Sequence, residues 1–409
     1  MRTSLDGSLL AEVARRLSAV DAARAARYPG DAGGRQPVHT CYVPADRVAE
    51  DLPAQWGAAA IEALEEHAPG PQAFAQVLGL PPELAEPVHE KVVAKLSREP
   101  VEDLRIDFED GYGTRADEDD DAVRAADLVG SGRLGAPWTG IRFKSFEAFE
   151  RGVRTLDLFL TGLVEVPDGL VLTFPKVTSA EQVTVLVELL ELLEDRLDLP
   201  EGRLRFEIQI ETTQSIVDSE GRFAIPGFIA AGKGRVSGLH FGTYDYTAAC
   251  GLSATEQHLA HAACDFARHV MQVSAAGTGV RLSDGSTNVL PVGDRESVHA
   301  AWRTHFGLTL RSLTHGFHQG WDLHPAQLVT RYAANYAFYL GNAAADAKRL
   351  RAFVNRADTG VLDEPATAQA LAMSMRRAMD CGALSAADVE ELCGLSEEEL
   401  GRLVRRESL

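Results

Sequence analysis

Short apolar segments alternate with stretches of helical periodicity along most of this chain. Segments of strand length occur at residues 38–45, 104–111, 139–146, 169–177, 204–212, 236–245, 277–285 and 315–325. Helical period is clearest at 179–197, where Ser179 is the expected N-cap, and at 253–272. Eight strands alternating with helices predict parallel βαβ units, which most simply close into a (β/α)8 TIM barrel. A doubly wound open sheet is the competing fold, and the lack of a GxGxxG motif after the first segment disfavours it.

Three regions lie outside the eight predicted units. Residues 1–37 are rich in Ala and Arg and are expected to form an N-terminal helical extension. Residues 38–330 hold the barrel, and within them about 46–103 is too long for one crossover and predicts a helical insertion. Residues 331–409 are expected to form a C-terminal helical lid or oligomerisation segment. The predicted organisation is therefore one large α/β domain with helical appendages.

Composition indicates a soluble globular protein with an acidic surface. Of the 409 residues, 45% are hydrophobic and 24% are charged, and 60 acidic against 40 basic residues give a net charge of −20. Such a surface repels nucleic acid and anionic membranes, so we expect neither as a partner. The N-terminus lacks the apolar core of a signal peptide, no apolar run is long enough to span a bilayer, and the five scattered cysteines form no CxxC pair. We therefore expect a cytoplasmic protein with reduced thiols.

Charged residues gather at the carboxyl ends of the predicted strands, where barrels of this kind build their active sites. In chain order these residues are Asp107, Glu109, Asp110, Arg142, Lys144, Lys176, Glu211, Asp245, Asp322 and His324. Each alone is explained as a polar strand end, and the whole set is explained as a salt-bridge network. Their order on one rim, acids followed by bases and then acids again, favours a hard-cation site beside an anion-binding patch.

Carboxylates on neighbouring strands are the ligands that a hard cation prefers. Mg²⁺ is often held by one or two protein carboxylates, and Glu211 and Asp245 could supply that pair, with Asp107 and its neighbours orienting metal-bound water. The lack of HxxxH or HxH spacing favours Mg²⁺ or Mn²⁺ over zinc. Arg142 could grip a substrate carboxylate with its planar fork. A 2-oxo acid bound to the metal would be polarised, which stabilises its enolate.

The two acids of the segment FEIQIE share one strand face but lie at different depths in the predicted barrel. Strand alternation sends the apolar side chains to one face and Glu207, Gln209 and Glu211 to the other, which is the interior of a closed barrel. Glu207, deeper in the barrel, is predicted to be a buried, paired acid with a structural role. Glu211, at the open end, is the metal-ligand candidate. His240 lies inside a strand and is predicted to be a hydrogen-bonded core histidine, whereas His324, near the rim, could touch a ligand.

Eight short segments, in order, resemble motifs of the HpcH/HpaI aldolase–citrate lyase β-subunit family, which belongs to the phosphoenolpyruvate/pyruvate barrel superfamily. The segments are CYVPADR, IDFEDG, GIRFKS, TFPKVTSAEQV, IETTQSI, LHFGTYDYTAACGL, GWDLHPAQL and TGVLDEPATAQA. The resemblance covers most of residues 38–370. It implies a barrel that uses Mg²⁺ for carbon–carbon bond chemistry on a small carboxylic or 2-oxo acid.

The resemblance also implies roles for particular residues. The matching residues are Glu211 and Asp245 for the metal, Arg142 for the substrate carboxylate, and Glu109 and Asp110 for the acids around the metal. Asp363 matches a lid aspartate that acts as acid/base from a neighbouring subunit, which implies a homo-oligomer, a trimer or hexamer. An N-cap role at a helix start explains Asp363 equally well.

The second predicted strand reads DFEDG and lacks the histidine base of the aldolase branch, so the lyase-like branch is favoured. The segment FKS places Lys144 at the rim, where it is expected to bind substrate together with Lys176 and His324. We therefore predict a Mg²⁺-dependent carbon–carbon lyase or aldolase. It would act on a β-hydroxy acid or its acyl thioester through a metal-stabilised enolate of a small 2-oxo acid or acetyl group.

Two other functions stay open. The segment HFGTYDYT also resembles malate synthases, which indicates a transferase that condenses acetyl-CoA. The third possibility is a non-catalytic barrel that binds a 2-oxo acid or phosphoenolpyruvate. The use of CoA stays open as well, because the sequence shows no concentrated basic cluster for its phosphates outside the site.

Overall fold

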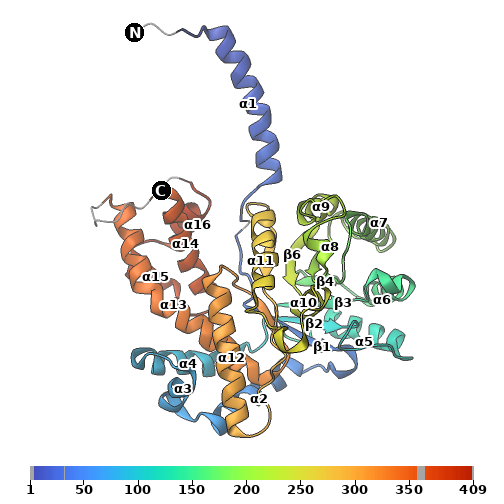
Figure 1. The fold of residues 1–409 in the computed structure, drawn as a ribbon, viewed down its shortest axis with the longest axis vertical. Coiled ribbons are helices and arrows are strands. Elements are labelled where there is room, and N and C mark those ends of the chain that lie inside the picture. Colours follow the sequence, from blue (N-terminus) through green and yellow to red (C-terminus); the bar gives the residue numbers. More distant parts are fainter. Residues whose placement is uncertain (1–3, 32, 357–363, 408–409) are drawn as a thin grey trace.

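A nearly closed barrel of eight parallel strands forms the centre of the computed structural model, which describes residues 4–31, 33–356 and 364–407 (Figure 1). The strands pair in the order β7-β6-β5-β4-β3-β2-β1-β8. Their bounds are β1 (His39–Pro44), β2 (Asp103–Asp107), β3 (Trp138–Arg142), β4 (Leu170–Phe174), β5 (Phe206–Ile210), β6 (Val236–Phe241), β7 (Arg281–Ser283) and β8 (Gly320–Asp322). A single bridge between Ser283 and Gln319 joins the two ends of the sheet. The predicted (β/α)8 fold is confirmed.

Each predicted apolar segment overlaps one strand, and each strand is shorter than its segment, because the polar residues at the carboxyl end leave the sheet. Helices follow the strands and cover the barrel. These are α5 (Glu118–Gly130), α6 (Phe149–Gly162), α7 (Ala180–Arg196), α8 (Thr213–Ile216), α9 (Ile225–Ala231), α10 (Thr243–Ala249), α11 (Ala262–Ala275), α12 (Arg295–Thr314) and α13 (Pro325–Val354). Short 3-10 turns lie at η1 (Ala45–Arg47), η2 (Phe146–Ala148) and η3 (Ala254–Glu256).

Two helix predictions have different outcomes. Ser179 caps α7, since its hydroxyl accepts a hydrogen bond from the Gln182 N–H, as predicted. The single helix predicted over 253–272 is partly wrong, because only a 3-10 turn forms in its first part. The reason is a cap in mid-segment: the ring Nδ1 of His261 accepts from the Ala263 N–H at 3.1 Å, so α11 begins there.

Strand β5 shows how alternation builds the barrel. Its three apolar side chains are fully buried between the sheet and the surrounding helices. Glu207 points into the barrel, where its carboxylate lies 3.0 Å from Nε2 of His240 and 3.3 Å from Nη2 of Arg105. The predictions of a buried, paired Glu207 and a hydrogen-bonded core His240 are confirmed.

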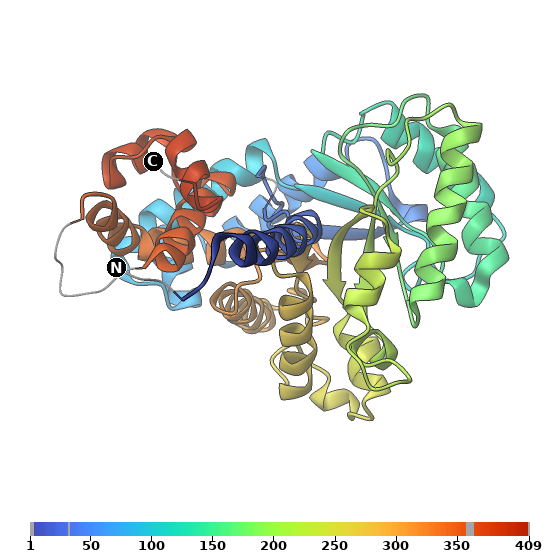
Figure 2. The same ribbon diagram turned by 90° about the horizontal axis from the view of Figure 1, so that it is seen from above.

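The expected helical appendages are present beside the barrel. The insertion forms α2 (Leu52–His67), α3 (Gly70–Leu78) and α4 (Pro82–Arg98), and the C-terminal part forms α14 (Pro365–Asp380), α15 (Ala386–Cys393) and α16 (Glu397–Val404). Both views place these helices together on one side of the barrel, around α13, which continues past the expected boundary at residue 330 (Figures 1 and 2). Helix α1 (Gly7–Arg27) extends away from the rest of the molecule. In the described ranges, no helix is long and apolar enough to cross a membrane.

Candidate active site

The strand topology brings the predicted rim residues to the carboxyl end of the barrel. Asp107 and Arg142 are the last residues of β2 and β3 and face each other in register. Glu211 directly follows β5. Asp245 lies in the first turn of α10, after β6, where it is exposed to solvent. Because β5 and β6 are neighbours in the barrel, the last two acids occupy adjacent positions on the rim.

Arg142 is locked in place by a bidentate ion pair with Asp107. Its Nε lies 2.6 Å from Oδ1 and its Nη2 lies 2.8 Å from Oδ2, and both side chains are buried. Burial alone would raise the pKa of Asp107, but the guanidinium and two backbone N–H groups lower it overall. The guanidinium also lies 4.9 Å from the ring centre of Tyr42. Asp107 therefore covers the Nε/Nη2 edge of the Arg142 guanidinium and leaves the Nη1/Nη2 edge uncovered.

Glu211 is a buried carboxyl that accepts hydrogen bonds from neutral donors. Oε1 accepts from the backbone N–H of Lys176 at 2.8 Å, and Oε2 accepts from the side-chain amide of Gln209. Its packing depends on Gly242, since a Cβ there would lie 2.4 Å from the Glu211 Cβ. Burial raises the pKa of Glu211 to about 8, and the charge of Asp245 adds to this rise against the opposing charges of Arg142 and Lys176. A cation at this position would stabilise the ionised form.

Lys176 connects the Glu211 carboxyl to the acids that follow β2. Its backbone is left-handed, with a φ of 51°, which turns its N–H toward Glu211. Its ammonium lies 2.9 Å from an Asp110 oxygen and 3.6 Å from a Glu109 oxygen. Burial raises the pKa of Glu109, and the charge of Lys176 opposes that rise. The structure thus brings Asp107, Glu109, Asp110, Arg142, Lys176 and Glu211 into one connected network.

Two other predicted residues, Lys144 and His324, lie outside this network. The Lys144 ammonium is buried and donates to the carbonyl oxygens of Phe108 at 2.8 Å and Gly113 at 2.6 Å, so it holds the loop after β2. His324 caps α13, where its Nδ1 accepts from the Ala326 N–H at 3.2 Å, and burial lowers its pKa. Asp363 lies outside the described residues.

Sequence reasoning did not assign a role in the site to Gln209, Tyr42 or Trp321. Gln209 accepts from Arg142 Nη1 at 3.2 Å and donates to Glu211, so it joins the arginine to the buried carboxyl. Its inward position follows from the alternation of β5, but its partners do not. The rings of Tyr42 and Trp321 lie beside Arg142 in a tilted arrangement, with ring centres 4.6 Å apart. The Tyr42 hydroxyl and the Trp321 Nε1 are buried without a hydrogen-bond partner among the described residues.

The donors at the rim fit a hard cation bound by few protein ligands. No group of three or more His, Cys, Asp or Glu side chains in the described ranges is arranged to hold a metal. Mg²⁺ commonly takes one or two carboxylates and fills its remaining positions with water and substrate oxygens. Glu211 is buried and has no ion-pair partner among the described residues. Together with the nearby Asp245 it forms a donor set of that kind.

A family model described as a domain of unknown function, DUF6986, matches residues 17–407. This chain belongs to that family. No curated protein matches the chain.

Among solved structures, this member of the DUF6986 family is similar to a citrate lyase from Burkholderia xenovorans LB400, with 17% identity and a TM-score of 0.57 over 90% of this chain and 99% of the other. A Haloferax volcanii malate synthase crystallised with glyoxylate matches with 17% identity and a TM-score of 0.47, over 74% of this chain and 76% of that one. An HpcH/HpaI aldolase/citrate lyase family protein from Burkholderia cenocepacia J2315 matches with 11% identity and a TM-score of 0.42, over 78% and 99%. At 17% identity, the similarity to the citrate lyase shows a shared fold.

Proposed function

We propose that this chain is a Mg²⁺-dependent carbon–carbon lyase or aldolase acting on a β-hydroxy acid or its acyl thioester. The observation that carries the proposal is the buried Glu211 carboxyl, held by neutral donors, with Asp245 beside it and Arg142 locked nearby. Cleavage next to a carboxylate needs an anion-binding group and a site that stabilises negative charge on the leaving fragment. These residues offer both at the carboxyl end of the barrel.

Glu211 and Asp245 would hold Mg²⁺, with Mn²⁺ as a substitute. When bound, the cation would polarise the carbonyl and carboxylate oxygens of a 2-oxo acid or acetyl fragment. The raised pKa of Glu211 means that this carboxyl must lose a proton to become a ligand. Cation binding should therefore release a proton below about pH 8.

Arg142 would orient the substrate. Asp107 covers its Nε/Nη2 edge, so the substrate carboxylate would approach the Nη1/Nη2 edge and compete with Gln209 for one N–H. Tyr42 and Trp321 lie beside the guanidinium, with ring centres 4.9 and 6.0 Å from its carbon, and would limit the access of water on that side. A rigid, partly dehydrated guanidinium binds a carboxylate more strongly than a mobile, hydrated one.

The role of Asp363 and the choice of lyase chemistry rest on resemblance to other proteins. Asp363, which would act as acid/base from a neighbouring subunit, requires a homo-oligomer. The fold shared with a citrate lyase is an analogy that favours lyase chemistry over other barrel reactions. Lys176 and His324 remain candidates for substrate contact.

The test is turnover of a panel of β-hydroxy acids and their CoA thioesters by the purified protein, with and without Mg²⁺. We expect cleavage that requires Mg²⁺, and loss of it in Glu211→Gln and Asp245→Asn. The matched control is Glu220→Gln, an exposed acid in the loop after α8, which should retain full activity. Full activity in both rim variants would refute the proposal. Release of free CoA from acetyl-CoA and glyoxylate would instead assign a condensing transferase, and ligand binding without turnover would assign a sensor.

A further inference from the structure

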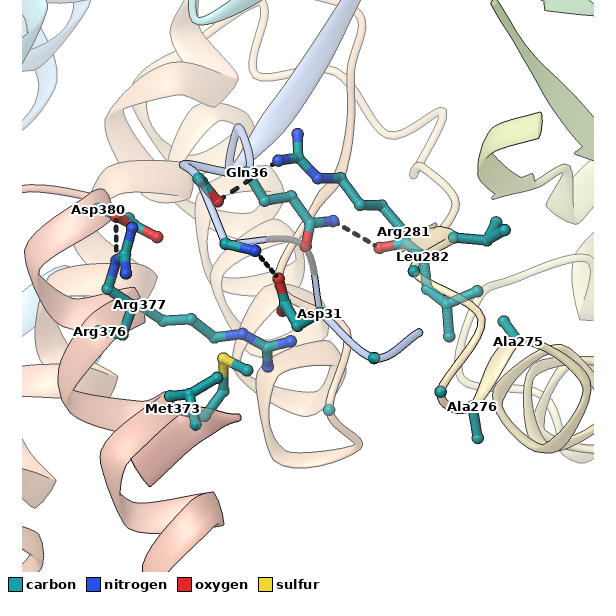
Figure 3. A pocket seen from close by; sticks show the side chains of 18 of the residues that line it. Asp31, Gln36, Ala275, Ala276, Arg281, Leu282, Met373, Arg376, Arg377 and Asp380 are labelled. Atoms are coloured by element: carbon teal, nitrogen blue, oxygen red, sulfur yellow. Dashed lines mark hydrogen bonds and ion pairs between the residues drawn. The ribbon is translucent and has the colours of Figure 1, made fainter. Parts of the chain in front are cut away.

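A cavity of about 350 Å³ lies at the end of the barrel opposite the candidate active site. Its walls include Gln36, which precedes β1, Arg281, the first residue of β7, and Gly316, which precedes β8. These positions are the amino ends of the strands, whereas the rim acids lie at the carboxyl ends. Helix α14 of the C-terminal part forms another part of the wall and contributes Arg376 and Arg377 (Figure 3).

Among the described residues, two of the three guanidinium groups in this cavity have no carboxylate at ion-pair distance. Arg376 pairs with Asp380 on the same helix, with Nε 3.3 Å from Oδ1. Neither Arg281 nor Arg377 forms an ion pair in the part of the chain that the structure describes, and Nη2 of Arg281 makes only a long contact of 3.4 Å with the Gly34 carbonyl oxygen. Burial lowers the pKa of Arg281, although Asp31 and Asp380 oppose that effect. Arg281 and Arg377 thus line one cavity, together with the carboxylates of Asp31 and Asp380, in a protein with a net charge of −20.

The rest of the lining leaves room for a small ligand. Gly30, Gly33, Gly277 and Gly279 have positive φ values and present backbone without side chains. Gln36 is already fixed, since its amide donates to the Leu282 carbonyl oxygen at 3.0 Å. Figure 3 shows Arg281 and Arg377 extending toward this space from the barrel and from α14. The volume is in the range of small-molecule sites.

We propose that this cavity binds a small, multiply charged anion bearing phosphate or carboxylate groups, held between Arg281 of the barrel and Arg377 of α14. Guanidinium groups bind both kinds of oxyanion through two parallel N–H bonds. The ligand would tie α14 to the amino end of the barrel. Helix α14 begins at Pro365, two positions after Asp363 in the sequence. A bound ligand would therefore restrain the helix that follows the predicted lid aspartate.

The competing role for Arg377 is structural. It lies in the last turn of α14, where a cation offsets the negative end of the helix dipole. That role predicts an effect of Arg377→Gln on thermal stability and none on anion binding. A calorimetric titration therefore distinguishes the two roles, because only the anion-binding role predicts weaker binding in Arg377→Gln.

Isothermal titration in Mg²⁺-free buffer, with pyrophosphate in one arm and citrate in the other, tests the proposal and distinguishes the two anion classes. Binding of at least one anion should weaken at least about tenfold in Arg281→Gln and in Arg377→Gln, and should weaken with added salt. Arg303→Gln, an exposed arginine on α12, is the control for the charge change and should bind normally. Arg142→Gln should bind pyrophosphate normally, which separates this site from the rim, where Arg142 would bind a carboxylate.

Equal affinity in the wild type and both cavity variants, or no binding of either anion at millimolar concentration, would overturn the proposal. Thermal melts without ligand show whether each variant is folded. If Arg281→Gln does not fold, Arg377→Gln and Arg377→Lys decide the question, because the lysine keeps the charge without the fork and should bind with intermediate affinity.

Discussion

Replacing Glu211 with glutamine should make stability less dependent on pH. The folded chain keeps the Glu211 proton up to about pH 8, because burial disfavours its charge, whereas the unfolded chain releases it near the ordinary glutamate pKa of about 4.3. Within that window the folded state binds more protons, so the free energy of unfolding falls as pH rises and is lowest above pH 8. Glutamine has the same shape and no proton to lose.

The size of the effect follows from the pKa. At about 1.4 kcal/mol per pH unit, the ionisation of Glu211 should lower the free energy of unfolding of the wild type by about 3 kcal/mol between about pH 6 and about pH 9. In a chain of 409 residues this corresponds to about 3–4 °C in Tm. Thermal melts of wild type and Glu211→Gln at both pH values measure the difference. Mg²⁺ at the higher pH should restore the wild-type Tm and leave that of the variant unchanged, since a ligand stabilises only a fold that binds it.

Glu207→Gln is the matched control, because it changes the other acid of β5. Burial would raise the pKa of Glu207, but His240 and Arg105 hold it at about 2. This variant should lose about 3 kcal/mol at both pH values, since it leaves a buried arginine partly unpaired, and it should keep its response to Mg²⁺. Parallel pH dependence in wild type and Glu211→Gln, or an equal Mg²⁺ response in both, would refute the reasoning.

Three further outcomes are expected. Arg142→Lys should lower kcat/KM at least about tenfold in a steady-state assay, because lysine cannot reproduce the bidentate pair; unchanged kinetics would argue against a role in substrate binding. Gly242→Ala should weaken Mg²⁺ binding in a calorimetric titration, because a Cβ there would displace Glu211, whereas Gly227→Ala, with its nearest neighbour at 3.8 Å, should bind normally. Removal of residues 1–27 should change Tm by no more than about 1 °C, since no residue of α1 is buried, and a larger fall would mean that the helix packs on the body.

Local pattern was sufficient to predict the barrel and the buried, paired state of Glu207. Eight apolar runs of strand length, separated by helical stretches, leave few alternatives to parallel βαβ units, and all eight strands form. Alternation sends both acids inward, and their positions along the strand place Glu207, which is paired with His240 and Arg105, deeper than Glu211 at the open end. Both results follow from local pattern along the chain.

The details of the site depend on contacts between distant segments and could not be predicted. The strand-end position of Lys144 predicts a side chain at the rim, but the path of the loop after β2 brings two carbonyl oxygens to its ammonium. Gln209 joins Arg142 to Glu211 because side chains from the ends of β3 and β5 meet inside the barrel, which no single motif records. The late start of α11 depends on a histidine cap, which is weaker as a sequence signal than Ser or Asp.

The central claim is that Glu211 and Asp245 hold a divalent cation next to Arg142. Anomalous diffraction from crystals soaked with Mn²⁺ and oxalate tests it most directly, because Mn²⁺ scatters anomalously and oxalate resembles a small 2-oxo acid. We predict one strong peak at bonding distance, about 2.2 Å, from both carboxylates, with an oxalate oxygen near the Nη1/Nη2 edge of Arg142. No peak at this rim, or a peak held by other residues, would contradict the account.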